Sequence, residues 1–234
     1  MTDLGEISWI LGIHVTRDRK EGWITLSQQK YLEEVLEHFD KANVCPISTP
    51  SLPNHHLVCL PSPEVDVKHF QWALGALMYL MLGTRPDIAY TIAALGRHAA
   101  NPGTEHQHAL DRLFQYLRGS LDYKLMYCRG VSGGDSILGY VDADWGSDVN
   151  DCKSTSGYVF TLSGGAILWS SKKQSAVALS STKADYIASV HAAKEAIWLR
   201  QLFMGLQQPS SFPIPLHIDN QSAIAIAKNP EFHD

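Results

Sequence analysis

The sequence lacks the features that mark several common classes of protein. Its four cysteines form no Cys-x-x-Cys pair, and its histidines form no cluster with the spacing of zinc ligands. The net charge of −5 provides no overall basic field to attract nucleic acid, although it does not exclude a local basic groove. The first residues lack the basic start and apolar stretch of a signal peptide. We therefore expect a reduced, intracellular protein without a structural zinc ion.

Long hydrophobic runs are missing too. The longest, residues 72–82, has eleven residues including Gly75, whereas a membrane-spanning helix needs about 20. We expect a buried helix there, and no membrane among the partners. Hydrophobic residues make up 45% of the chain and charged residues 18%, which is an ordinary globular composition and allows a buried core.

The first half of the chain is expected to form a β-hairpin followed by helices. Residues 9–15 and 23–26 read as strands on either side of a polar turn, and Ser27 is expected to cap a helix that ends near Phe39. Five prolines between positions 45 and 66 predict an extended linker. Further helices are expected over residues 70–82, 85–100 and 104–117.

The second half predicts a different pattern, in which strands come first and then alternate with helices. The order strand-strand-strand-helix-strand-helix is typical of an α/β layered fold with a mixed sheet. The expected elements are, in chain order, strands 137–145, 155–162 and 166–170, helix 181–206, strand 215–219 and a helix from residue 221.

Three aspartates lie at the edges of these elements. Asp142 is expected to end one strand and Asp219 another, and Asp185 lies near the start of the long helix. Such carboxylates are able to converge on one hard cation, because oxygen ligands suit Mg²⁺. The apolar stripe of the helix leads back to Asp185, a buried charge that needs a partner, whereas Lys183 should face solvent. That stripe consists of Ala192, Ala196, Leu199, Phe203 and Leu206.

Each aspartate also has a purely structural interpretation. Asp142 would suit a turn at a strand end, and Asp219 with Asn220 would suit the N-cap of the following helix. Asp185 would favour the dipole near the start of its own helix. Each of these alternatives is the better one for its residue alone, but the three acids together favour a metal site.

Several ordered motifs resemble the C-terminal part of the Pol polyprotein of copia-type retrotransposons. The motifs similar to its ribonuclease H region are GYVDADW (139–145), KSTSGYVF (153–160), WSSKKQ (169–174), ALSSTKADY (178–186), AKEAIWL (193–199), DNQSA (219–223) and KNP (228–230). DLG (3–5), LGI (11–13) and LSQ (26–28) resemble the end of its reverse transcriptase, and GALMYL (75–80) with TRPDIA (84–89) its connection region. The resemblance covers nearly the whole chain.

The resemblance implies three domains. Residues 1–50 would be the end of the reverse transcriptase palm and thumb, 51–124 a linker and helical connection, and 125–234 a ribonuclease H-like mixed sheet with flanking helices, truncated at its C-terminus. The implied substrate is an RNA–DNA hybrid, and the implied partner is the upstream reverse transcriptase region of the same polyprotein. The implied location is the cytoplasm, virus-like particles or the nucleus.

The implied activity is hydrolysis of the RNA strand by two Mg²⁺ ions, with Mn²⁺ as an alternative. Asp142, Asp185 and Asp219 would be the catalytic metal ligands. Lys172 and Lys173 are candidates for phosphate contacts, although solvated lysines at a strand end explain each of them more simply.

The sequence departs from the family pattern at two positions and at its end. The family usually has Glu at position 185 and an acid at position 183, where this chain has Asp and Lys. Its pattern also continues to a fourth carboxylate that this sequence lacks, and its polymerase carboxylates lie upstream. We therefore expect no DNA synthesis by this chain alone and an impaired nuclease. A non-catalytic module that binds hybrid or polymerase, and a genomic remnant without function, are the alternatives.

Overall fold

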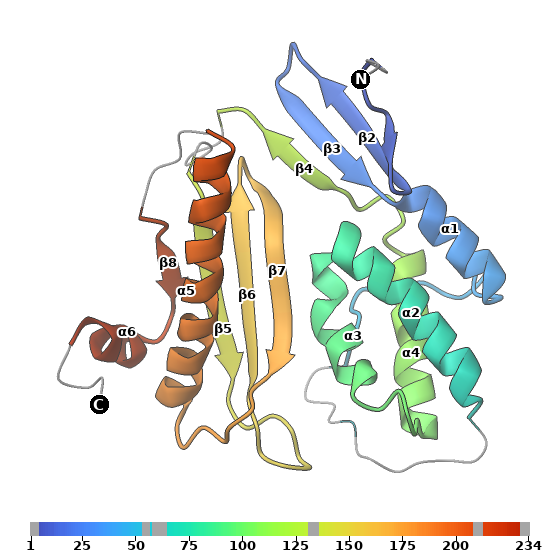
Figure 1. The fold of residues 1–234 in the computed structure, drawn as a ribbon. Coiled ribbons are helices and arrows are strands. Elements are labelled where there is room, and N and C mark those ends of the chain that lie inside the picture. The colour runs from blue at the N-terminus through green and yellow to red at the C-terminus, as the bar shows by residue number, and fades with distance from the viewer. Residues whose placement is uncertain (1–4, 53–56, 58–64, 131–135, 208–212, 230–234) are drawn as a thin grey trace. The chain divides into compact units, whose positions relative to one another are not determined.

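The computed structural model describes residues 5–52, 57, 65–130, 136–207 and 213–229. The chain divides into two compact units, Met1–Tyr127 and Cys128–Asp234 (Figure 1). Each unit has a four-stranded sheet, and each has its own hydrophobic core. None of the described helices is both long and apolar enough to cross a membrane.

The sheet of the first unit has the strand order β1-β2-β3-β4. These strands are β1 (Trp9–Ile10), β2 (Ile13–Asp18), β3 (Trp23–Ser27) and β4 (Leu125–Cys128). The expected single strand over residues 9–15 is wrong, because Leu11 and Gly12 both adopt positive φ and form a tight turn between β1 and β2. The expected hairpin of β2 and β3 is confirmed. Strand β4, at the start of the predicted third domain, joins this first sheet.

The helices of the first unit pack around one apolar core. They are α1 (Gln29–His38), α2 (Val67–Gly83), the 3₁₀ turn η1 (Pro86–Ile88), α3 (Ala89–Gly96) and α4 (Thr104–Arg118). Leu32 and Leu36 of α1 share this core with Phe70 of α2 and Phe114 of α4. Residues from the first two predicted domains therefore belong to one packed unit.

Two local predictions for the first unit need correction or completion. Ser27 does not occupy the N-cap of α1; Gln28 does, and the Ser27 hydroxyl accepts a hydrogen bond from the Gln29 N–H at 3.2 Å. The expected linker is irregular over residues 44–52, which contain two of its five prolines. Residues 53–56 and 58–64, with the other three prolines, lie outside the described part of the chain.

The second unit contains the expected mixed sheet, with the strand order β7-β6-β5-β8. Strands β5 (Leu138–Asp144), β6 (Thr155–Leu162) and β7 (Gly165–Lys173) pair antiparallel, and β8 (Leu216–Ile218) pairs parallel to β5. Helix α5 (Ser181–Gly205) lies along this sheet, and α6 (Gln221–Lys228) follows β8 (Figure 1). The order of elements is the one predicted from the sequence.

The expected stripe of α5 faces the sheet over most of its length. Ala188, Ala192 and Leu199 are buried with Val141 and Phe160 of the sheet, and Ala196 and Phe203 pack against this core. Leu206 does not belong to the stripe, since the residue is 58% exposed and lies just beyond Gly205, where α5 ends. Lys183 is exposed, as expected, and Asp185 is buried. The helix thus delivers one carboxylate to the sheet from its second turn.

Candidate metal centre

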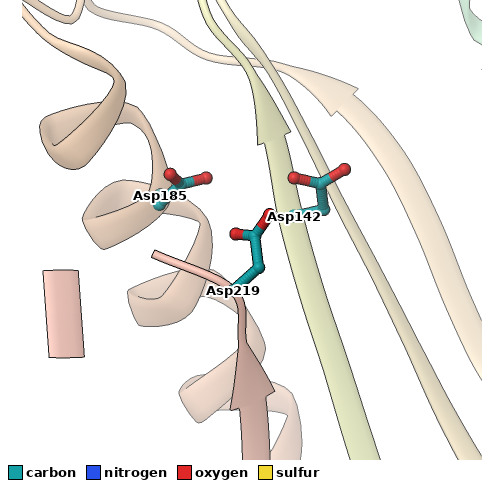
Figure 2. Close-up of side chains that lie close together, drawn as sticks. All are labelled: Asp142, Asp185 and Asp219. Carbon is teal, nitrogen blue, oxygen red and sulfur yellow. The ribbon is translucent and has the colours of Figure 1, made fainter. Parts of the chain in front are cut away.

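The carboxylates of Asp142, Asp185 and Asp219 converge from three different elements. Each offers one oxygen, and these oxygens all lie within 4.8 Å of one another. Figure 2 shows Asp142 on β5, Asp185 on α5 and Asp219 at the end of β8, with their carboxylates turned toward a shared space. Asp185 is buried, whereas Asp142 and Asp219 are exposed, so the cluster is open to solvent on one side.

The parallel pairing of β5 and β8 brings two of these carboxylates together. Val141 pairs with Ile218, and the next residues along the two strands are Asp142 and Asp219. Strands that run in the same direction keep such residues side by side. Asp142 does not end its strand, as the sequence had suggested, since β5 continues to Asp144 and Asp142 lies opposite Gly157 of β6. A turn role for Asp142 is therefore excluded.

Asp185 is a buried carboxylate whose hydrogen bonds are incomplete. Its side chain is 5% exposed, and Oδ2 accepts a hydrogen bond from Asn220 Nδ2 at 2.9 Å. Oδ1 is buried and has no hydrogen-bond partner of ordinary geometry within the described residues. Burial of a charged oxygen without a partner of ordinary geometry is costly, and a bound cation would offset this cost.

The surroundings of Asp185 raise its pKa above the ordinary value of 3.8. Burial is the main cause, and the nearby charges of Asp219 and Asp142 act in the same direction. The Asn220 side chain and the backbone amide of Ala143 act against this rise. Within the described part of the chain, none of the three aspartates forms an ion pair. A bound cation would offset the mutual repulsion of the three carboxylates.

The purely structural roles considered for Asp219 and Asp185 are also poorly supported. Asn220, not Asp219, caps α6: its Oδ1 accepts hydrogen bonds from the N–H groups of Ser222 and Ala223 at 3.0 and 3.1 Å. Asp185 lies in the second turn of α5, beyond the first turn in which the helix dipole acts most strongly. Neither carboxylate is needed to start a helix.

The donor set of this cluster fits a hard divalent cation. All three ligand candidates are carboxylates, whose oxygens suit Mg²⁺ and Mn²⁺ better than they suit Zn²⁺. Asp185 in addition has a buried oxygen with no hydrogen-bond partner of ordinary geometry among the described residues. Asp142, Asp185 and Asp219 are the residues that would hold such an ion. Their assignment as ligands stays a prediction, whereas their spatial convergence is a property of the fold.

The sequence is similar to proteins encoded by transposons. Along its whole length, the chain is 41% identical to the retrovirus-related Pol polyprotein from transposon TNT 1-94 of Nicotiana tabacum. Over 99% of its length it is 33% identical to the corresponding polyprotein from transposon RE1 of Arabidopsis thaliana. It is also 30% identical to an uncharacterized mitochondrial protein of Arabidopsis thaliana, of which it covers 80%. The chain is therefore similar, over nearly its whole length, to one part of the retrovirus-related Pol polyproteins of plant transposons.

This Pol-related chain corresponds to only a part of the polyproteins. It spans 18% of the Nicotiana tabacum protein and 16% of the Arabidopsis thaliana protein from transposon RE1. No family model and no solved structure matches the chain.

The two candidate phosphate-binding lysines of this Pol-related chain differ in their surroundings. Lys172 is exposed and forms no ion pair among the described residues. Lys173 is not a solvated lysine, since its Nζ lies 2.6 Å from Asp148 Oδ2 and 2.7 Å from Asp151 Oδ1. Because two carboxylates already neutralise Lys173, it is a poor candidate for a phosphate contact. Lys172 keeps its candidate role.

Two residues that support the cluster were not identified from the sequence. Asn220 bonds to Asp185 across 35 positions, and its only visible signal was the N-cap pattern of Asn220 before Ser222 and Ala223. Gln174 follows β7, and its Nε2 donates to Ser156 Oγ on β6 and to the Ala184 carbonyl on α5, both at 2.9 Å. A lone glutamine after a strand carries no local signal for such a role.

Proposed function

We propose that the second unit is a ribonuclease H-like nuclease module that uses Mg²⁺ or Mn²⁺ to cut the RNA strand of an RNA–DNA hybrid. The first unit would then be the end of the reverse transcriptase and its connection in a copia-type Pol polyprotein. The upstream reverse transcriptase region is the proposed partner. Similarity to part of the transposon Pol polyproteins provides the context for this proposal, and the carboxylate cluster provides its chemistry.

One observation carries the proposal. Three carboxylates that are far apart in sequence each offer an oxygen within 4.8 Å of the others, and the buried one has an oxygen without a hydrogen-bond partner of ordinary geometry in the described part of the chain. A fold that only needed these residues for stability would pair Asp185 or leave it exposed, because an unpaired buried charge lowers stability. The arrangement is therefore better explained by a cation that completes it.

The three aspartates would divide the work according to their exposure. Asp185 is fixed by α5 and by its bond to Asn220, so it would act as the rigid ligand. Asp142 and Asp219 are exposed and leave one side of the cluster open, where a phosphodiester and a water molecule would enter. Bound Mg²⁺ would supply activation of that water and stabilisation of the leaving oxygen.

Cleavage of a hybrid by the purified full chain tests this proposal. An RNA–DNA hybrid labelled on its RNA strand should be cut in the presence of Mg²⁺ or Mn²⁺, and duplex DNA of the same sequence should stay intact. Asp142→Asn should reduce the rate by at least about 10²-fold, because a displaced metal misplaces the reacting groups. Asp151→Asn makes the same chemical change outside the cluster and should leave the rate unchanged.

Two results would contradict the proposal. The first is an intact hybrid with both metals under conditions in which circular dichroism shows a folded chain. The second is a rate that Asp142→Asn and Asp151→Asn reduce equally, since this would place the activity outside the cluster.

A second candidate is a non-catalytic module that binds the hybrid. It is favoured by Asp185, whose side chain is one methylene shorter than the glutamate of the family pattern, because a shift of about 1 Å costs roughly 10²-fold in rate. Binding that weakens with salt and survives Asp142→Asn, without any cleavage, would support this candidate over the nuclease.

A further inference from the structure

The side chain of Asn220 connects α6 to the carboxylate cluster. Its Oδ1 accepts hydrogen bonds from the N–H groups of Ser222 and Ala223, at 3.0 and 3.1 Å. Its Nδ2 donates to Asp185 Oδ2 at 2.9 Å. Both ends of one amide are thus engaged, one by the helix that follows and one by the buried aspartate.

The orientation of this amide is determined by its partners. Reversing it would point the NH₂ group at two N–H donors and the carbonyl oxygen at a carboxylate oxygen, and both contacts would be repulsive. The helix cap therefore commits the NH₂ group to Asp185. Helix α6 contacts α5, and Ala223 is buried, so the cap residue is held in a fixed position relative to the helix that carries Asp185.

This contact makes Oδ1 the oxygen of Asp185 that is more available to another ligand. The amide uses one lone pair of Oδ2, whereas Oδ1 is buried and has no hydrogen-bond partner of ordinary geometry among the described residues. Because Asn220 directly follows Asp219 in the chain, the same residue also fixes the backbone next to the third carboxylate. One side chain therefore orients Asp185 and anchors the segment that presents Asp219.

We propose that Asn220 is a positioning residue of the metal centre, which holds Oδ2 of Asp185 so that Oδ1 is presented to the cation. This inference rests on the proposed function, because it requires that the cluster binds a divalent metal. Partners of this kind fix the orientation of a ligand, and their loss typically costs about 10- to 100-fold in metal affinity.

Two substitutions of Asn220 separate positioning from helix capping. Asn220→Ser keeps a side-chain oxygen that caps a helix about as well as asparagine, but it removes the NH₂ donor. Asn220→Ala removes both the cap and the donor. Two quantities are measured. The affinity for Mn²⁺ is obtained from the electron paramagnetic resonance signal of the free ion, and the melting temperature is recorded for the metal-free full chain.

If Asn220 positions Asp185, both variants bind Mn²⁺ about tenfold more weakly than the unchanged chain, and Asn220→Ala has the lower melting temperature of the two. The inference is overturned if Asn220→Ser binds Mn²⁺ like the unchanged chain. It is also overturned if the loss of affinity follows the loss of stability and is clearly larger in Asn220→Ala. Absence of Mn²⁺ binding by the unchanged, folded chain would instead refute the proposed function.

Discussion

Each unit of the chain buries a charged side chain, and the two differ in how the charge is compensated. In the first unit, Arg85 is 2% exposed and bonds to Asp87 through Nε and Nη2, and to the Ser120 carbonyl and hydroxyl through Nη1 and Nη2. Tyr116 completes this network with a 2.7 Å hydrogen bond to Asp87. In the second unit, Asp185 is also buried, but among the described residues one of its oxygens has no hydrogen-bond partner of ordinary geometry.

The difference is the one expected between a charge that the fold alone explains and a charge that would be completed by a bound ligand. The guanidinium group of Arg85 donates hydrogen bonds to acceptors on Asp87 and Ser120. These contacts within the polypeptide are enough to explain why the charge of Arg85 can be buried. Asp185 accepts one hydrogen bond of ordinary geometry from the Asn220 amide, is also affected by the backbone amide of Ala143, and lies beside two further carboxylates. The comparison therefore predicts that removing the charge of Arg85 lowers the free energy of unfolding, whereas removing the charge of Asp185 raises it.

The largest expected effect on stability comes from Arg85→Ala. This substitution leaves Asp87 and the Ser120 carbonyl without their main partner and should lower the free energy of unfolding by about 3 kcal/mol. Arg19→Ala, which breaks the exposed pair with Glu6, is the control and should change it by at most about 0.5 kcal/mol. Urea unfolding measures both, and equal effects of the two variants would contradict a structural role for the buried network.

Asp148 sharpens the comparison, because it is a buried aspartate of the second unit that does have a partner. Burial acts to raise its pKa, but hydrogen bonds from Lys173 and Asn150 outweigh burial and lower the pKa to about 2. The pKa of Asp148 in the folded protein lies below the ordinary value of 3.8. The Asp148 carboxylate therefore stabilises the fold fully at a pH above 3.8, and this contribution is lost as the pH falls toward 2.

Asp148→Asn should therefore destabilise the protein by about 2 kcal/mol at pH 7, with a smaller effect below pH 4. Urea unfolding over this pH range measures the change. An effect that stays constant with pH would mean that the charge of Asp148 is not what stabilises the loop that carries it.

Asp185→Asn should have the opposite sign and the smallest size. The neutral amide removes a buried charge and its repulsion from Asp142 and Asp219, so the metal-free protein should gain about 1 kcal/mol of stability. Because the pKa of Asp185 is raised in the folded state, protonated Asp185 favours folding at low pH and this contribution is lost as the pH rises through the raised pKa. The gain from Asp185→Asn should thus grow with pH in thermal unfolding without metal, and a loss of stability at pH 7 would refute the comparison.

For the second unit, the helices and strands were predicted from the sequence more completely than the contacts between their side chains. Apolar periodicity and glycine turns predicted every strand of its sheet, and the stripe of α5 predicted that Asp185 points inward. The convergence was expected from carboxylates at strand ends and at a helix start, but the parallel pairing of β5 and β8 that brings Asp142 and Asp219 together was not assigned from the sequence. The bond between Asn220 and Asp185 was not predictable, since nothing local couples residues 35 positions apart.

The failures in the first unit have a similar origin. Leucine rarely adopts positive φ, so the apolar run gave no sign of the turn that Leu11 and Gly12 form. The pairing of β4 with the first sheet depends on a contact about a hundred residues along the chain from β3, and the sequence gives no register for it. Arg85 was visible only as a residue before a helix, because its burial depends on Ser120 and Tyr116 from the end of α4 and the turn after it.

The most direct test of the metal centre is anomalous diffraction from crystals of the full chain soaked in Mn²⁺. A peak in the anomalous map within coordination distance of Asp185 Oδ1, Asp142 and Asp219, absent from crystals of Asp185→Asn, is the predicted result. Well-diffracting crystals without density there at saturating Mn²⁺, or with the same peak in Asp185→Asn, would show that the three aspartates do not form a cation site.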